Sequence, residues 1–190
     1  MREDDLQREL GIGRTPIREA LQRLARDQFV TVIPRRGVLV TGIEVADLAV
    51  LYETRAVLEP YAARLACWRG DRAHWDEMAL TLQRTDGAAP DELLDVDRTC
   101  HEIIWAAADN RFLTATLDML YAQSDRLWHM YLADVADMSD AVDEHAAILD
   151  ALVAGDADRA AALAEAHVRS FDAQVRDAVT RRLGPPLAGA

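Results

Sequence analysis

The stretch from Leu10 to Phe29, LGIGRTPIREALQRLARDQF, constrains the fold of this chain more than any other. Gly13 interrupts the chain, and Thr15 followed by Pro16 is a helix-start signal. A threonine hydroxyl accepts from a free backbone N–H, and proline at the first helical position needs no N–H. The apolar residues that follow recur at helical spacing on one face: Ile17, Ala20, Leu21, Leu24 and Ala25. The sequence therefore predicts a short amphipathic helix capped by Thr15.

The N-terminal end of this helix has the chemistry of a nucleic-acid contact. Arg14 stands just before Thr15, and Arg18 points away from the apolar stripe. Phosphates bind to the free N–H groups of helix N-termini, and arginine recognises the edge of guanine with two hydrogen bonds. Residue types alone still favour the alternative, which is a solvated helix with ordinary surface arginines.

The residues after Phe29 change that balance. Two β-prone runs, 30–33 and 38–41, flank the turn Pro34-Arg35-Arg36-Gly37 and predict a hairpin with a basic tip. A helix followed by such a hairpin is typical of the latter part of a winged helix-turn-helix.

Here the chain also resembles a known family. Over residues 2–41, GRTPIREALQRLARDQFV followed by PRRGVLV resembles the DNA-binding segment of GntR-type bacterial transcription regulators. The resemblance implies a recognition helix and a wing that contact DNA, and the candidate residues for those contacts are Arg14, Thr15, Arg18, Arg35, Arg36 and Gly37.

The N-terminus departs from the family pattern. Residues 3–10 predict a helix with Leu6 and Leu10 inward and a turn at Gly11, but a complete winged helix needs one more helix before it. Family members usually carry arginine where this chain has Asp4, and an acid at that position repels phosphate. Either the natural start lies upstream of Met1, or this winged helix is impaired in DNA binding.

Composition excludes some functions and leaves others open. No apolar run approaches the roughly 20 residues that a membrane-spanning helix requires, and no signal peptide opens the chain. Cys67 and Cys100 have no redox or metal spacing, so we expect a cytoplasmic protein without a membrane partner. The net charge is −12, yet residues 1–40 carry eight arginines against six acids, so the acidic excess belongs to the rest.

From residue 44 onward the chain reads as successive helices with the 3.6-residue period. They are expected near 44–68, 71–84, 91–108, 111–132, 140–154 and 156–182, with a loop over 133–140. The predicted fold is mostly α: a small, truncated winged helix-turn-helix followed by an antiparallel bundle of six or seven helices. We assign residues 1–42 to the DNA-binding domain, 43–183 to the helical effector-binding and dimerisation domain, and 184–190 to a disordered tail.

Four polar residues stand on helix faces that are otherwise apolar. Asp97 and His101 are one turn apart, while His145 and His167 lie on two later helices. Burying these groups unpaired costs several kcal/mol, so they either bond to one another or share a cation. Three nitrogens and one oxygen suit Zn²⁺, or Ni²⁺ and similar ions, with coordination positions left open. The alternative is a hydrogen-bonded network without metal.

The helical part resembles the FCD domain, the ligand-sensing domain of the FadR branch of GntR regulators. The resemblance rests on ETRAVLEPYAARLA (53–66), DRTCHEII (97–104) and EHAAILDALVAGDADRAAALAEAHV (144–168). Metal-binding members hold the ion with Asp-x-x-x-His and two later histidines separated by 22 residues, and all four positions match Asp97, His101, His145 and His167. His74 and His129 lie outside this pattern, and we expect His129 at the surface.

Arg55 is another polar residue on an apolar face, where it shares the face with Leu48, Leu51, Tyr52 and Leu58. An ion pair with Glu59, one turn later, would explain it. Alternatively its guanidinium binds a ligand carboxylate with two hydrogen bonds. The resemblance implies an arginine that faces the effector cavity beside the metal, and hence a receptor for a small organic acid.

The sequence thus predicts a metabolite-responsive transcriptional regulator, in this family most often a repressor. It should bind operator DNA as a homodimer and respond to an acid bound at a divalent metal. A metal-dependent hydrolase is one alternative, although no further inward Glu or Asp stands out as a general base. A sensory or dimerising fragment without competent DNA binding is the other, motivated by Asp4 and the missing first helix.

Overall fold

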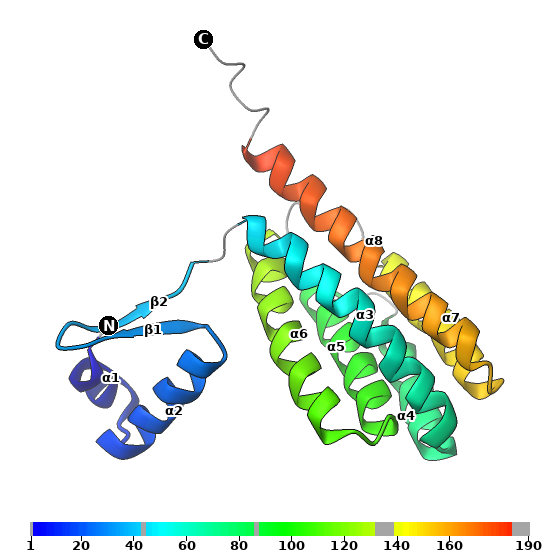
Figure 1. Ribbon diagram of the computed structural model, residues 1–190, viewed down its shortest axis with the longest axis horizontal. Coiled ribbons are helices and arrows are strands. Elements are labelled where there is room, and N and C mark those ends of the chain that lie inside the picture. The colour runs from blue at the N-terminus through cyan, green and yellow to red at the C-terminus, as the bar shows by residue number, and fades with distance from the viewer. Residues whose placement is uncertain (1, 43–44, 86–87, 132–138, 184–190) are drawn as a thin grey trace, which may run out of the picture. The chain divides into compact units, whose positions relative to one another are not determined.

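The computed structural model describes residues 2–42, 45–85, 88–131 and 139–183 (Figure 1). The described residues are mostly helical and form two compact units, which divide between Glu44 and Val45. No helix in these ranges has both the length and the apolar character to span a bilayer.

The first unit contains two helices and a hairpin: α1 (Glu3–Leu10), α2 (Arg14–Arg26), β1 (Val30–Ile33) and β2 (Gly37–Val40). The strands are antiparallel, with Val30 opposite Val40 and Ile33 opposite Gly37. Buried side chains of α2 and of both strands form a small core, against which parts of α1 and the α2–β1 turn pack: Ile17, Leu21, Val30 and Val38, with Leu6, Ala25 and Phe29. The predicted recognition helix and wing are therefore present.

Two local predictions about this unit are wrong. The N-cap of α2 is Gly13 and not Thr15, because the extended backbone of Gly13 immediately precedes the helix and no side chain caps it. Pro16 consequently lies in the first turn, where a missing N–H costs nothing. Leu10, expected to point inward, is 59% exposed, because it ends α1 and the small core takes only Leu6 from that helix.

The second unit is a helical bundle with short connections. Its elements are α3 (Val45–Arg69), α4 (Arg72–Leu82), the 3-10 turn η1 (Gln83–Thr85), α5 (Pro90–Ala107), α6 (Arg111–Tyr131), α7 (Ser139–Val153) and α8 (Ala157–Leu183). These bounds lie within two residues of the predicted helices at every end. Most of the loop predicted over 133–140 lies outside the described residues, as does the tail 184–190, and Ser139 and Asp140 begin α7.

Two pairs of helices set the position of the polar residues. The long helices α3 and α8 pack side by side (Figure 1), and α7 returns against α8 through a tight turn. In that turn Gly155 has φ 73°, and the N–H of Asp156 donates to the carbonyl of Ala151. This closure is a Schellman motif, which favours glycine at the left-handed position. The turn holds α7 and α8, which carry His145 and His167, antiparallel to each other.

We expect Gly155→Ala to lower the free energy of unfolding by about 1–2 kcal/mol, because a Cβ is disfavoured in the left-handed region. No atom lies within 4 Å of an added Cβ, so the loss would come from the backbone and not from a clash. Urea titration followed by circular dichroism measures it. Gly155→Asn is the matched control and should lose less, since asparagine tolerates this conformation; equal losses would contradict the backbone explanation.

Candidate functional site

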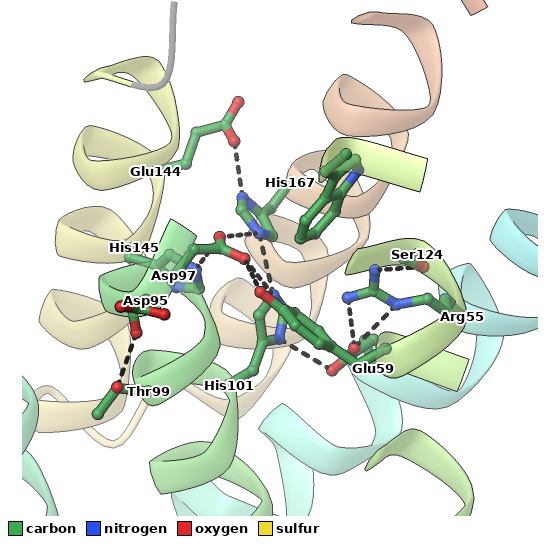
Figure 2. A network of polar contacts seen from close by, with 12 residues as sticks. Arg55, Glu59, Asp95, Asp97, Thr99, His101, Ser124, Glu144, His145 and His167 are labelled. Carbon is green, nitrogen blue, oxygen red and sulfur yellow. Dashed lines mark hydrogen bonds and ion pairs between the residues drawn. The ribbon is translucent and has the colours of Figure 1, made fainter. Parts of the chain in front are cut away.

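The four predicted metal ligands meet in the interior of the bundle. α5 supplies Asp97 and His101, α7 supplies His145 and α8 supplies His167 (Figure 2). One ligand atom from each lies within 4.8 Å of all the others. All four residues are at most 3% exposed. Residues 70 positions apart in the sequence thus form one cluster, as the helical periodicity predicted.

Asp97 is the centre of this cluster. Its Oδ1 lies 2.9 Å from His145 Nε2 and 3.3 Å from His167 Nε2. Its Oδ2 accepts a hydrogen bond of 2.7 Å from the hydroxyl of Tyr121 and lies 3.9 Å from His101 Nε2. The Nε2 atoms of His101 and His167 are 3.2 Å apart. All three imidazoles therefore direct Nε2 toward the carboxylate.

The charges of these groups are strongly coupled. Burial would raise the pKa of Asp97, but the neighbouring His101 and the hydrogen bonds from His145 and His167 hold it well below its usual value. Burial and the neighbouring His167 lower the pKa of His145 to about 4. Burial acts in the same direction on His167, yet its bonds to Asp97 and Glu144 raise its pKa to about 9. At neutral pH and without metal, Asp97 is ionised, His145 neutral and His167 protonated.

The donor set fits a transition-metal ion. An ion with bonds of about 2.0–2.1 Å keeps its ligand atoms roughly 3–4 Å apart. The contacts of Asp97 with the three imidazoles run from 2.9 to 3.9 Å, and all four ligand atoms lie within 4.8 Å of one another. Three imidazoles and one carboxylate suit Zn²⁺ or Ni²⁺ better than Mg²⁺ or Ca²⁺, which prefer oxygen. The same contacts also satisfy the four groups as a hydrogen-bonded network without metal. A measurement of metal content would distinguish the metal site from the network.

Arg55 lies in the same interior and is 1% exposed. Its Nη2 and Nε donate to Glu59 Oε1 at 2.9 and 3.3 Å, and its Nη1 donates to the hydroxyl of Ser124 at 3.1 Å. The ion pair considered as the alternative for Arg55 is therefore formed. Burial works against the charge of Arg55, but Glu59 more than offsets it, and the pKa of the guanidinium is raised.

Some contacts at the site were not found from the sequence. Glu59 was considered only as an ion-pair partner of Arg55, but its side chain is 2% exposed and also accepts from Trp105 Nε1 at 2.8 Å. Its position four residues after Arg55 was the signal for its orientation. Tyr121 and Glu144, which contact Asp97 and His167, carried no such signal, since nothing in the sequence pairs them with residues on other helices. His129 is exposed, as predicted.

The candidate DNA-binding residues lie at the surface of the first unit. Arg14 and Thr15 open α2, Arg18 follows one turn later, and Arg35 and Arg36 are exposed in the turn that leads to Gly37 at the start of β2. Two of these arginines already have acidic partners on α1. Arg14 Nη2 lies 2.8 Å from Asp4 Oδ1, and Arg18 Nε lies 2.8 Å from Glu3 Oε2.

Comparison with known protein families decides the identity. Residues 1–40 match the bacterial regulatory proteins of the gntR family, and residues 50–170 match the FCD domain. The chain belongs to the FCD-domain regulators of the GntR family.

Individual relatives of this GntR-family regulator agree. The Nta operon transcriptional regulator of Aminobacter aminovorans is 28% identical over 180 residues, which cover 93% of this chain and 84% of that protein. The transcriptional repressor GlaR of Escherichia coli is 28% identical over 171 residues, covering 84% and 77%. In fold, E. coli McbR/YncC is similar with a TM-score of 0.84 at 20% identity, covering 95% and 88% of the two chains.

These similarities place the protein among transcriptional regulators and not among enzymes. The metal-dependent hydrolase considered from the sequence is accordingly set aside. The buried Asp–His cluster lies within the residues that match the FCD domain.

The pKa values predict how the stability of the metal-free GntR-family regulator depends on pH. His145 has a lower pKa folded than the usual 6.5, so it binds fewer protons when folded and stability falls as pH drops from 6.5 to about 4. His167 has a higher pKa when folded, so its contribution is complete below pH 6.5 and is lost as pH rises through about 9. In the presence of a chelator, the free energy of unfolding measured by urea titration should therefore be highest near pH 6.5. His167→Gln should remove the alkaline loss; a loss of the same size in that variant would contradict the assignment.

Proposed function

We propose that this regulator holds one divalent metal ion through Asp97, His101, His145 and His167, and that an acid bound there controls its binding to operator DNA. The observation that carries the proposal is the convergence of four buried donor atoms within 4.8 Å of one another. Zn²⁺ is the first candidate, with Ni²⁺ or another transition ion as alternatives. When bound, such an ion would offer open coordination positions to a ligand oxygen.

The ligand proposed for those positions is a small organic acid. Arg55 supplies the second charge that a carboxylate requires, and arginine binds carboxylates with two parallel hydrogen bonds. Glu59 occupies that edge of the guanidinium in this structure. An effector carboxylate that pairs with Arg55 therefore has to take the place of the Glu59 carboxylate.

DNA is proposed to bind to the first unit. We assign Arg14, Thr15 and Arg18 of α2 to the major-groove contact, and Arg35, Arg36 and Gly37 to the wing contact. This assignment gives residues 1–42 the DNA-binding role and residues 43–183 the sensory and dimerising role, with 184–190 as a tail. We further propose that the protein belongs to the FadR branch, acts as a cytoplasmic homodimer and functions as a repressor, as the transcriptional repressor GlaR does.

A second candidate function is supported by one observation. Asp4 and Glu3 neutralise the two arginines that α2 would present to phosphate. A chain in which these pairs persist would sense its ligand without competent DNA binding.

Metal content tests the first part of the proposal. Protein purified without a nickel column should contain about one ion per chain by elemental analysis. His101→Ala and His167→Ala should each lose it, because each variant removes one of the four protein donors that would hold the ion. His129→Ala, which removes an exposed imidazole, is the matched control. An absence of metal in every preparation would leave the histidines as a hydrogen-bonded network.

The effector is tested with metal-loaded protein and DNA selected from a random-sequence library. Among dicarboxylates and hydroxy acids, at least one should change the DNA affinity by roughly 5- to 150-fold, the range of a coupling of about 1–3 kcal/mol. Fluorescence anisotropy at fixed salt measures this, and metal-stripped protein should not respond. Affinity unaffected by every acid in the panel would exclude the acid-sensing role.

The acids on α1 test whether DNA binding is suppressed. Glu3→Gln combined with Asp4→Asn frees Arg14 and Arg18, so the affinity for double-stranded DNA should rise about three- to tenfold, with a steeper dependence on salt. Fluorescence anisotropy at several salt concentrations measures both. Asp5→Asn is the control, because Asp5 pairs with Arg8 and not with α2. Unchanged affinity in the double variant would show that DNA already displaces these acids at no cost.

A further inference from the structure

A line of polar contacts extends beyond the four candidate ligands on two sides, to buried Glu59 on one and to partly exposed Glu144 on the other (Figure 2). On one side, His101 Nδ1 lies 3.3 Å from Glu59 Oε2, and the other oxygen of Glu59 accepts from Arg55. On the other side, His167 Nδ1 lies 2.8 Å from Glu144 Oε2. Two of the three imidazoles therefore lie between an outer carboxylate at Nδ1 and the centre of the cluster at Nε2.

This arrangement determines which nitrogen can bind a metal. A carboxylate at Nδ1 accepts the N–H of that nitrogen, which leaves the lone pair on Nε2 and fixes the orientation of the ring. Both Nε2 atoms already converge on Asp97. His145 differs: its Nε2 also contacts Asp97, but its Nδ1 is buried without a hydrogen-bond partner among the described residues.

Glu59 is itself held in place by three donors. Trp105 Nε1 donates to Oε2 at 2.8 Å, and Nε and Nη2 of Arg55 donate to Oε1. A buried carboxylate whose two oxygens both accept hydrogen bonds has a defined position. Glu59 therefore also restricts the orientation of the His101 ring that it contacts.

We propose that Glu59 and Glu144 are positioning residues for the metal site, and that Arg55 acts on the metal ligand His101 through Glu59. The inference rests on the proposed function for the existence of a metal, and goes beyond it by assigning three residues outside the ligand set. It also makes Glu59 the link between the proposed metal ion, which His101 binds, and the proposed effector acid, which Arg55 binds. An acid that takes Arg55 removes one support of Glu59 and therefore alters how His101 is held.

The test uses the full-length protein and metal alone, so it needs no effector. Zn²⁺ affinity is measured by competition with a chromophoric chelator, and the Co²⁺-loaded protein is examined by visible absorption, which reports coordination geometry. Glu144→Gln and Glu59→Gln should each weaken Zn²⁺ binding about 10- to 100-fold and change the Co²⁺ spectrum. Glu102→Gln is the matched control on α5, since Glu102 is exposed and pairs with Arg98; both readouts should stay unchanged.

Because Glu59→Gln leaves Arg55 buried beside a neutral partner, that variant can lose its fold. Glu144 avoids this problem, since its side chain is 32% exposed and its bond is to His167. The role of Arg55 is read from Arg55→Lys, which keeps the charge but not the two-donor edge. It should weaken Zn²⁺ binding in the wild-type background and add nothing in the Glu59→Gln background, the non-additivity expected of residues that act through one another.

Each outcome is decisive. Wild-type Zn²⁺ affinity and an unchanged Co²⁺ spectrum in Glu144→Gln would overturn the positioning role of the outer carboxylates while leaving the metal site intact. Additive effects of Arg55→Lys and Glu59→Gln would overturn the relay through Glu59. A wild-type protein that takes up no metal would overturn both this inference and the metal part of the proposed function.

Discussion

The buried carboxylate of Asp97 is the contact on which the helical unit depends. It stands on α5 and meets Tyr121 of α6, His145 of α7 and His167 of α8. An ionised carboxylate in a protein interior costs several kcal/mol unless its oxygens are satisfied. The partners come from three other helices, so the carboxylate is satisfied only when all four helices are packed together. The position of the histidines around Asp97 is therefore tied to the packing of the bundle.

The buried pair of Arg55 and Glu59 connects α3 to the same polar cluster. Both residues are nearly inaccessible, and Glu59 connects them to Trp105 and His101 on α5. Buried ion pairs of this kind are poor sources of stability, because well-packed apolar side chains of similar volume often serve as well or better. Their presence next to a cluster of histidines is instead typical of a binding site, where local rules of burial are broken for function.

Much of this structure could be predicted because the 3.6-residue period of apolar residues shows which face of each helix points to the core. The 3.6-residue period and the breaks at Gly70, Asp109 and Gly155 placed the helices, and polar residues on apolar faces identified Asp97 and the three histidines. Partners on other helices could not be predicted in the same way. Tyr121 and Glu144 are ordinary residues in their own helices, and only the packing of α6 and α7 brings them to Asp97 and His167.

Thr15 shows the complementary limit. Its hydroxyl and the following proline both favour a helix start, yet the backbone of Gly13 already provides the extended residue from which α2 begins. Gly13 and the pair Thr15-Pro16 are both helix-start signals, and they lie within four residues of each other. The helix begins after Gly13, a boundary that the apolar periodicity of α2 does not indicate. The helices of the bundle were less affected by this ambiguity, because their long apolar stripes identify each helix even where the signals at its ends are uncertain.

The depth of the histidine cluster has a kinetic consequence. Because all four residues are at most 3% exposed, an ion held among them could leave only when a helix opens locally. Its residence time would then follow the rate of that opening and not the concentration of free metal outside. An acid that binds to the ion is larger than the ion, so it would need an opening at least as wide to reach it. The exchange rates of the metal and of the acid would then both depend on how often the bundle opens.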